Sequence, residues 1–417
     1  MKKLIGVIGV GYVGLPLALK FSNHFEVIGY DRSNRRVLEL SKSIDTNKEH
    51  NKKNFNKKNL TFTNNFQSLK ACNVFVITLP TPLNKKNNPD LIAVVNLCKN
   101  LGKFLKKSDT VIFESTVYPG ATEELFLPAL EKTSSLKVNK DFYLGYSPER
   151  INPGDKVNTL EKITKVISGS NKKSLGIVES IYKKIIKAGV HKVSSIRVAE
   201  LCKVVENTQR FVNIALVNEI SILCNKLNIQ TKEVIDAASS KWNFMKFYPG
   251  LVGGHCIAVD PLYLSYKSKF YRLKPDIIST SHKINSNVAN FIINNFNKIV
   301  NKKNPKVLIL GATFKENCSD VRNSGVIKII QLLNKRQINP IVYDPYVNTN
   351  LNDEIRYKFK LQKKIQKSNY DVIIILVAHR FFKKMGIQKI KNLSNNKNCL
   401  IMDIKSIFSK DKVDFQL

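Results

Sequence analysis

The feature that most constrains the fold of this chain is a glycine pattern near the N-terminus, Gly9-x-Gly11-x-x-Gly14. The pattern lies between a short apolar run and a helix-like segment. In a strand–turn–helix unit Gly9 permits the tight turn, Gly11 lets the backbone approach a pyrophosphate, and Gly14 lets the helix pack on the strand. The free N–H groups at the start of such a helix bind phosphate. The pattern predicts a dinucleotide-binding βαβ unit.

The acid expected after the second strand is also present. The apolar run 25–31 ends in Asp31, which lies 22 residues after Gly9. A carboxylate there accepts a hydrogen bond from the ribose 2′-hydroxyl of NAD. Arg32, Arg35 and Arg36 follow, and arginine can accommodate the 2′-phosphate of NADP. The sequence favours NAD and keeps NADP as an alternative.

The alternation of strands and helices continues along the chain. The stretches 73–83 and 109–120 are each predicted to contain a strand, whose C-terminal end falls at Thr81-Pro82 in the first and at Ser115-Thr116 in the second. Ligands of open parallel sheets lie beyond the carboxyl ends of the strands, so both hydroxyls are candidates for cofactor contact. Their alternative role is that of turn-forming hydroxyls.

A second βαβ unit is predicted at 306–346, with a turn at Gly311, a helix at about 322–335 and a strand that ends in Asp344. Further strands are expected at 370–379 and 399–404. This unit lacks Gly-x-Gly-x-x-Gly, so we expect a different ligand, with Lys315 and Arg322 as cations for an anion. The predicted fold is α/β, with two Rossmann-like doubly wound parallel-sheet domains joined by a long helical connector.

The composition narrows the class of protein. The chain has 68 Lys+Arg and 32 Asp+Glu among 417 residues, a net charge of +36. Nucleic-acid binding is one explanation. The lysines are scattered beside asparagines, however, and no zinc-finger or RNA-recognition pattern accompanies them, so we expect solvated surface lysines and no nucleic-acid partner.

The spacing of the cysteines and the length of the apolar runs indicate the cellular compartment of the protein. Seven dispersed cysteines without a CxxC pair argue against a disulfide framework and against a metal site. Four glycines interrupt the N-terminal apolar run, which argues against a signal peptide. No run approaches the ~20 apolar residues of a membrane span. The expectation is a cytoplasmic protein without membrane insertion.

A long helix is predicted at 199–227. Its apolar stripe lies opposite Lys203, Asn207 and Arg210. The stripe comprises Leu201, Val204, Val205, Thr208, Phe211, Val212, Ala215, Leu216, Ile220 and Leu223. Such a polar stripe is usually solvated, but an amine, an amide and a guanidinium one turn apart can also hold an oxyanion or a phosphate. The helix also suits a domain connector or a dimer interface.

Cys256 is the candidate nucleophile. It follows Gly253 and Gly254, which would leave the backbone open to a ligand, and it precedes Asp260 by four residues. A thiol near a hydride acceptor can capture an aldehyde as a thiohemiacetal, which is oxidised to a thioester and then hydrolysed. Lys203 is the cation expected to favour the thiolate. The alternative is a buried structural cysteine.

Several stretches together resemble the UDP-glucose/GDP-mannose 6-dehydrogenases. They include GVGYVG (9–14), ESTV (114–117), YSPERINPGD (146–155), KWNFMKFYPGLVGGHCIAVDPLYL (241–264) and ATFKENCSDVRNS (312–324). The likeness is strongest to bacterial UDP-N-acetylglucosamine/UDP-N-acetylgalactosamine 6-dehydrogenases of capsule and O-antigen synthesis. It implies a four-electron oxidation of the sugar C6 alcohol to the uronate with NAD, in a homodimer or higher homo-oligomer. It also implies an NAD-binding domain at 1–195, a connector at 196–298 with the catalytic cysteine, and a UDP-binding domain at 299–417.

The resemblance also implies roles for individual residues. The implied catalytic residues are Cys256, Lys203, Asn207, Asp260, Glu149 and Thr116. The implied NAD-binding residues are Gly9, Gly11, Tyr12, Val13, Gly14, Asp31, Arg36, Thr81, Thr116 and Arg322. The implied UDP-sugar-binding residues are Glu149, Arg150, Ile151, Lys203, Asn207, Arg210, Phe247, Tyr248, Gly250, Gly253, Phe314 and Lys315.

The sequence departs from the family pattern at Leu262, where tyrosine is frequent, and at 281–285, where SHKIN replaces an Arg-Arg pair and keeps one charge at Lys283. Other hypotheses remain open at this stage. They are a UDP-glucose or UDP-N-acetylmannosamine substrate, a two-electron dehydrogenase with a structural Cys256, and a nucleic-acid-binding protein.

Overall fold

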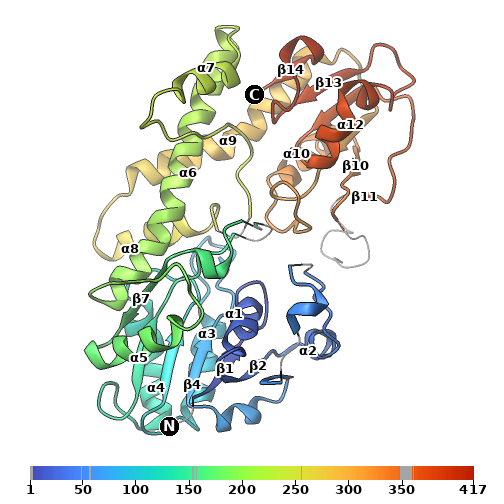
Figure 1. Cartoon of the computed structure of the whole chain (residues 1–417). Coiled ribbons are helices and arrows are strands. Elements are labelled where there is room, and N and C mark those ends of the chain that lie inside the picture. The colour runs from blue at the N-terminus through green and yellow to red at the C-terminus, as the bar shows by residue number, and fades with distance from the viewer. Residues whose placement is uncertain are drawn as a thin grey trace. The chain divides into compact units, whose positions relative to one another are not determined.

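The computed structural model describes residues 3–47, 49–55, 58–152, 155, 157–254, 256–347, 359 and 361–417. The chain divides into two compact units (Figure 1). The N-terminal unit comprises residues 1–206 and 262–273, and the C-terminal unit comprises 207–261 and 274–417. The boundary falls within the long helix α6 (Ile196–Lys226).

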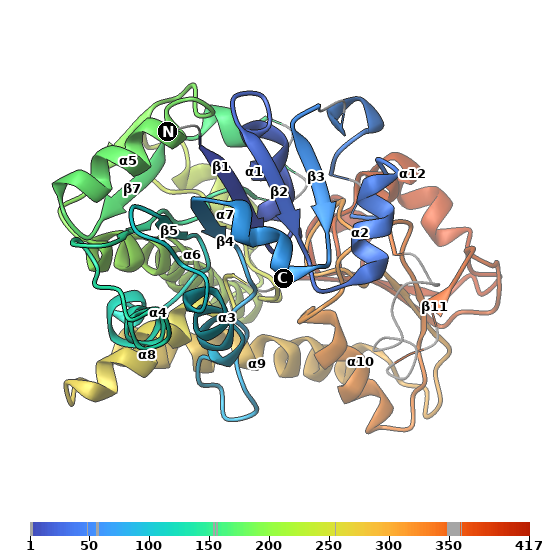
Figure 2. The same ribbon diagram turned by 90° about the horizontal axis from the view of Figure 1, so that it is seen from below.

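The N-terminal unit is built on an eight-stranded sheet of order β3-β2-β1-β4-β5-β6-β7-β8. The first six strands have the order of a dinucleotide-binding fold, and Figure 2 shows β3, β2 and β1 lying side by side. The strands are β1 (Leu4–Ile8), β2 (Glu26–Tyr30), β3 (Leu60–Thr63), β4 (Val74–Ile77), β5 (Thr110–Phe113), β6 (Tyr143–Tyr146), β7 (Lys165–Gly169) and β8 (Val190–Lys192).

Helices cover both faces of this sheet. One face packs against α1 (Gly14–Phe21) and α5 (Lys172–Tyr182), which bury aliphatic side chains on alternate strand positions. The other face packs against the segments around α3 (Ile92–Gly102) and α4 (Leu127–Ser134), where Phe113 stacks on Phe126 with ring centroids 4.9 Å apart. Helix α2 (Asn34–Ser41) contacts β3 at the sheet edge. The predicted α/β order of this half is confirmed, but β4 and β5 end at Ile77 and Phe113, before the predicted ends at Thr81 and Thr116, which lie in the loops that follow.

The last two strands run against the other six. β7 pairs antiparallel with β6, and β8 pairs parallel with β7. The link between β6 and β7, residues 147–164, contains only one short 3-10 helix among its described residues. Without a crossover helix the chain turns back beside β6. As a result β7 begins beside the carboxyl ends of β5 and β6.

The C-terminal unit contains a six-stranded parallel sheet of order β11-β10-β9-β12-β13-β14, which repeats the order of the first six strands of the N-terminal unit. One face packs against α9 (Asp276–Ile299) and α10 (Val326–Asn334), and the other against α12 (Arg380–Lys391). The strands are β9 (Val307–Leu310), β10 (Ile341–Tyr343), β11 (Leu361–Gln362), β12 (Val372–Ile375), β13 (Leu400–Asp403) and β14 (Phe415–Gln416). The prediction of a second Rossmann-like domain is confirmed.

The remaining helices lie between the two sheets in sequence. They are α6, α7 (Thr231–Ala238) and α8 (Asp260–Phe270). Prediction placed the long helix at 199–227, which differs from α6 by a few residues at its start. None of the helices that the structure describes is long and apolar enough to span a membrane.

A buried carboxylate ties the start of α6 to the N-terminal unit. Glu200 is fully buried, and its two oxygens accept the backbone N–H groups of Gly120 at 2.5 Å and Thr122 at 2.9 Å. Burial raises the pKa of Glu200 to about 7, against the opposing effect of these hydrogen bonds. The folded chain therefore holds a proton on Glu200 at pH values where the unfolded chain has lost it.

This burial predicts a pH-dependent stability. Because the folded pKa is above the unfolded value, the Glu200 contribution is favourable below about pH 4.5 and is lost as the pH rises through about 7. The loss amounts to at most about 3 kcal/mol. Glu200→Gln keeps an acceptor oxygen but does not titrate. Denaturant unfolding at about pH 5 and about pH 7.5 should therefore show a shallower pH dependence for the variant, and parallel curves would contradict the assignment.

Candidate active site

The glycine turn of the N-terminal unit has the geometry of a phosphate cradle. Gly9 has φ +93° and donates its N–H to Tyr30 O at 2.8 Å. A Cβ on Gly14 would lie 1.9 Å from Gly9 O, so only glycine fits there. A Cβ on Gly11 would meet no atom within 4 Å. Gly9 and Gly14 are required by the fold, whereas Gly11 leaves open space above the turn for a ligand.

Asp31 and Arg36 complete this cradle. Asp31 accepts the N–H groups of Val10 at 3.2 Å and Ser33 at 2.9 Å, so its carboxylate is fixed at the end of β2. Arg36 donates Nε to Val10 O and Nη1 to Asp45 Oδ1, both at 3.0 Å. Its Nη2 is buried and finds no hydrogen-bond partner among the described residues. The open turn and this spare donor fit a dinucleotide that brings an acceptor of its own.

The predicted hydroxyls at the strand ends lie together in the N-terminal unit. Thr81 donates Oγ1 to Thr116 O at 2.6 Å, and the Tyr263 hydroxyl donates to Thr81 O. Ser115 donates to Leu79 O at 2.7 Å. These bonds join the loops after β4 and β5. The Thr81 hydroxyl therefore has a structural partner, in line with the alternative role weighed from the sequence, while Thr116 remains half-exposed.

Glu149 lies in the loop after β6 and is 7% exposed. Its Oε1 accepts the backbone N–H groups of Arg150 and Ile151, each at 2.6 Å, and its Oε2 accepts from Lys165 Nζ at 3.3 Å. Arg150 forms an ion pair with Glu206 of α6 at 2.8 Å. The three adjacent candidates at 149–151 thus form one hydrogen-bonded turn.

Two of the three polar-stripe residues of α6 are buried, contrary to the usual case. Lys203 and Asn207 are 8% and 9% exposed, whereas Leu201 and Val205 of the apolar stripe are 42% and 47% exposed. Arg210 is exposed and continues the polar row. Burial of an amine and an amide on a helix requires polar partners, which points to a functional face and not a solvated one.

Cys256 is the exposed thiol of the chain. The structure describes all seven cysteines, and Cys256 alone is classed as exposed. Its carbonyl accepts the N–H of Asp260 at 2.9 Å, so the cysteine sits in the turn that begins α8. Asp260 is 3% exposed and accepts from Asn207 Nδ2 at 2.5 Å. Two predicted site residues far apart in sequence are brought together one turn from the thiol.

The reason inferred for the two glycines before Cys256 was wrong. Gly253 and Gly254 do not leave an open backbone, because the segment 314–325 packs directly on them. A Cβ on Gly253 would lie 2.8 Å from Asn323 O, and one on Gly254 would lie 2.7 Å from the Phe314 ring. Gly254 also donates its N–H to Asn323 O at 3.0 Å. The glycines fix the cysteine loop against the C-terminal sheet domain.

A pair of asparagines holds the preceding turn. Asn218 on α6 accepts the Gly250 N–H at 2.8 Å, donates to Gly250 O at 3.2 Å and donates to Asn285 Oδ1 at 2.8 Å. Asn285 is the last residue of the SHKIN stretch, in which Lys283 is exposed. Among the neighbouring candidates Phe247 is half-buried and the Tyr248 hydroxyl donates to Asp236 at 2.7 Å.

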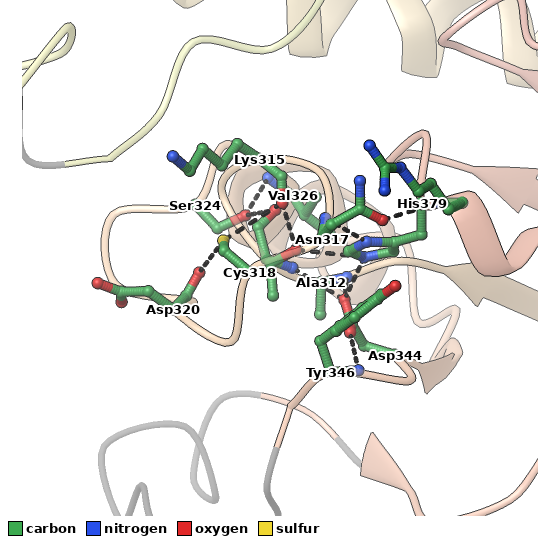
Figure 3. Close-up of polar contacts among 12 residues, drawn as sticks. Ala312, Lys315, Asn317, Cys318, Asp320, Ser324, Val326, Asp344, Tyr346 and His379 are labelled. Atoms are coloured by element: carbon green, nitrogen blue, oxygen red, sulfur yellow. Dashed lines mark hydrogen bonds and ion pairs between the residues drawn. The ribbon is translucent and has the colours of Figure 1, made fainter. Parts of the chain in front are cut away.

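The turn of the second βαβ unit is held by a buried His–Asp pair (Figure 3). His379 Nε2 contacts Asp344 Oδ2 at 3.0 Å, and its Nδ1 accepts the Asn317 N–H at 2.9 Å. Asp344 also accepts the Ala312 N–H at 2.7 Å. Burial raises the pKa of Asp344, but these hydrogen bonds reverse that effect and hold the pKa below its usual value. Asp344 is thus sealed, unlike Asp31, and serves the loop that carries Lys315.

The two predicted cations of this loop, Lys315 and Arg322, differ in their contacts. Lys315 is half-exposed, and its Nζ lies 5.6 Å from the centroid of the Phe314 ring. Arg322 forms an ion pair with Asp320 at 2.6 Å. Figure 3 shows Lys315 reaching outward from the loop that His379 supports.

Sequence reasoning missed Lys165, His379 and the Asn218–Asn285 pair. The histidine had a signal, since it ends the predicted strand 370–379 at the edge where ligands bind. The other residues stand on no recognisable pattern. Only tertiary contacts show that they hold loops of the candidate site.

Comparison with known proteins shows which family the chain is similar to. Models of the UDP-glucose/GDP-mannose dehydrogenase family match residues 3–186 with its NAD binding domain, 197–287 with its central domain and 308–410 with its UDP binding domain. A UDP-N-acetyl-D-glucosamine 6-dehydrogenase of Pseudomonas aeruginosa is 45% identical over 100% of both chains.

Two further relatives extend the likeness. A UDP-N-acetyl-D-glucosamine 6-dehydrogenase of Salmonella typhi is 43% identical over 99% of this chain and 98% of its own. The structure of a UDP-D-ManNAc dehydrogenase of Pyrococcus horikoshii superposes with a TM-score of 0.88 at 27% identity, covering 99% of this chain and 98% of the other. Because family models and relatives span nearly the whole sequence, the chain belongs to the UDP-glucose/GDP-mannose dehydrogenase family and is an NAD-dependent oxidoreductase.

Proposed function

We propose that this enzyme oxidises the C6 alcohol of UDP-N-acetyl-D-glucosamine, or of its C4 epimer UDP-N-acetyl-D-galactosamine, to the uronate. The observation that carries the proposal is the exposed Cys256 thiol, one turn before the buried Asn207–Asp260 pair. The names of the Pseudomonas and Salmonella relatives support the choice of sugar.

The first half of the reaction converts the alcohol to an aldehyde. The Gly9–Gly14 turn would hold NAD, which would supply the hydride acceptor for each of the two oxidations. Lys203 and Asn207 bind the C6 oxygen and stabilise its developing negative charge, because a preorganised amine and amide stabilise an oxyanion best in a buried setting. Asp260 holds Asn207 in place through the 2.5 Å hydrogen bond.

The second half passes through the thiol. The Cys256 thiolate adds to the aldehyde carbon to form a thiohemiacetal, and loss of the second hydride gives a thioester. A water then attacks C6 while Glu149 accepts its proton, assisted by Thr116. The C6–S bond breaks with its electron pair returning to sulfur. The balance is one alcohol, one water and two NAD⁺ giving one carboxylate, two NADH and three protons.

The remaining candidates bind the two nucleotides. Gly11, Asp31 and Arg36 hold NAD, together with Gly9, Tyr12, Val13, Gly14, Thr81, Thr116 and Arg322. The UDP-sugar is bound by Lys315 and Phe314 and by the segment 247–253, with contributions from Glu149, Arg150, Ile151, Lys203, Asn207 and Arg210. The three-part division at 1–195, 196–298 and 299–417 follows the same assignment.

The setting of the enzyme is also a proposal. The exposed part of the apolar stripe of α6, Leu201, Val205 and Leu216, suits contact with a second copy of the chain in a homodimer or larger homo-oligomer. The product class suits a cytoplasmic enzyme that supplies polysaccharide synthesis.

A substrate panel tests this function. UDP-GlcNAc and UDP-GalNAc should be oxidised with kcat/KM at least about tenfold above UDP-glucose and UDP-ManNAc, a difference of about 1.4 kcal/mol that one well-placed contact can supply. NADH should form at two molecules per uronate. One NADH per product would leave a two-electron dehydrogenase with a structural Cys256, and preference for UDP-ManNAc would replace the proposed sugar.

A further inference from the structure

Three ionisable side chains are buried together at the carboxyl ends of β5 and β6 in the N-terminal sheet. Glu114 follows β5, Glu149 follows β6, and Lys165 is the first residue of β7. Because β7 is antiparallel to β6, its start lies beside the carboxyl ends of β5 and β6. The exposed fractions of the three side chains are 0% for Glu114, 8% for Glu149 and 3% for Lys165.

Lys165 bridges the two carboxylates. Its Nζ donates to Glu114 Oε2 at 2.6 Å, to Pro148 O at 3.2 Å and to Glu149 Oε2 at 3.3 Å. These contacts use all three ammonium protons. The Tyr182 hydroxyl donates to the other oxygen of Glu114, which fixes that carboxylate in turn. Lys165 is therefore held in one position.

Hydrogen bonds hold both oxygens of the Glu149 carboxylate. Its Oε1 accepts two backbone N–H groups, from Arg150 and Ile151, and its Oε2 accepts from Lys165. Oε2 keeps one lone pair that these contacts do not use. A carboxylate held in this way presents a single oxygen in a single direction, which is what a base that removes a proton from a water requires.

A buried charge cluster contributes little net free energy to the stability of a fold. Apolar side chains of similar volume often stabilise a fold as well as a buried ion pair does, because removing charges from water is costly. Burial alone would lower the pKa of Lys165, but the charges of Glu114 and Glu149 raise it above its ordinary value. The ammonium thus remains charged beside Glu149.

We infer that Lys165 is a positioning residue for Glu149 in thioester hydrolysis, and that Glu114 and Tyr182 hold Lys165 in place. The inference rests on the proposed role of Glu149. In that step a water oxygen bonds to C6, its proton passes to the free lone pair of Glu149 Oε2, and the C6–S bond breaks toward Cys256. Lys165 takes no proton. It holds the Glu149 carboxylate in position.

The test compares Lys165→Met with Lys165→Arg and with Glu149→Gln in the full-length enzyme. Methionine keeps the length of the side chain and removes the charge. We expect Lys165→Met to lower kcat for uronate release by about 10- to 100-fold, as loss of a supporting contact does. The KM values for NAD and the UDP-sugar should change less than about threefold, and an acyl adduct should accumulate on Cys256 as in Glu149→Gln. Lys165→Arg should restore part of the rate.

Other outcomes separate the two claims. Loss of NAD affinity and of hydrolysis in equal measure, without the adduct, would overturn the positioning role. Should Lys165→Met fail to fold, Tyr182→Phe and Glu114→Gln make the same test, since each loosens Lys165 while keeping side-chain volume. Wild-type release in both would also overturn it. Absence of an adduct in Glu149→Gln itself would refute the proposed role of Glu149, a failure distinct from that of Lys165.

Discussion

Cys256→Ala should produce no uronate, with the rate of acid formation at least about 10⁴-fold below that of the natural enzyme, as expected when a covalent nucleophile is removed. The cysteine turn is exposed, and its backbone contacts to Asp260 use the carbonyl of residue 256, which alanine retains. NAD and UDP-sugar binding should therefore persist. Acid formation is measured by product analysis, and NAD binding by calorimetry.

The matched control is Cys399→Ala in the C-terminal unit. Burial raises the pKa of the Cys399 thiol to about 11, so this thiol stays protonated and is not a nucleophile. The control should retain wild-type uronate formation. Residual acid production near the wild-type rate in Cys256→Ala would exclude the covalent route, and equal losses in both variants would indicate a general effect on folding.

Gly11→Val should abolish tight NAD binding while leaving the fold intact. A Cβ on Gly11 meets no protein atom within 4 Å, so the side chain extends into the open space above the turn. That space is where we place the pyrophosphate. We expect NAD affinity to fall at least about 100-fold, about 2.7 kcal/mol, with an unchanged melting temperature. Calorimetric titration with NAD and a thermal melt measure the two effects.

Gly14→Ala supplies the contrast. Its Cβ would lie 1.9 Å from Gly9 O and 2.5 Å from Thr78 Oγ1, so the helix and strand must separate. Such a shift typically costs about 1–3 kcal/mol. This variant should have a lower melting temperature than the natural enzyme even in the absence of NAD. Wild-type NAD affinity in Gly11→Val would show that the cofactor does not approach this turn.

Much of the fold could be predicted because it depends on local patterns. The spacing of Gly9, Gly11 and Gly14 and the acid at Asp31 identify the first βαβ unit, and the repeat of Gly311 and Asp344 identifies the second. In the structure Gly9 and Gly311 have nearly equal φ angles of +93° and +94°. In both halves a glycine with a positive φ angle forms the turn between a strand and the segment that leads to the next helix.

The rest depends on contacts between distant segments. Periodicity placed Lys203 and Asn207 on one helical face but did not show that both are buried. Nor did it show that the opposite, apolar stripe is exposed at Leu201, Val205 and Leu216. The antiparallel direction of β7, which brings Lys165 to Glu149, follows from the path of an irregular link. Likewise, the packing of Gly253 and Gly254 on Phe314 and Asn323 involves a loop sixty residues further along the chain.

The central claim is that the sulfur of Cys256 bonds to C6 of the sugar between the two oxidations. Its most direct test is an acid-quenched single turnover, followed by mass mapping of the peptide that contains Cys256. We expect an added mass equal to the UDP-uronyl group on Cys256, which appears with NADH and disappears as uronate is released. Formation of NADH and uronate with an unmodified Cys256 at every time point would contradict it.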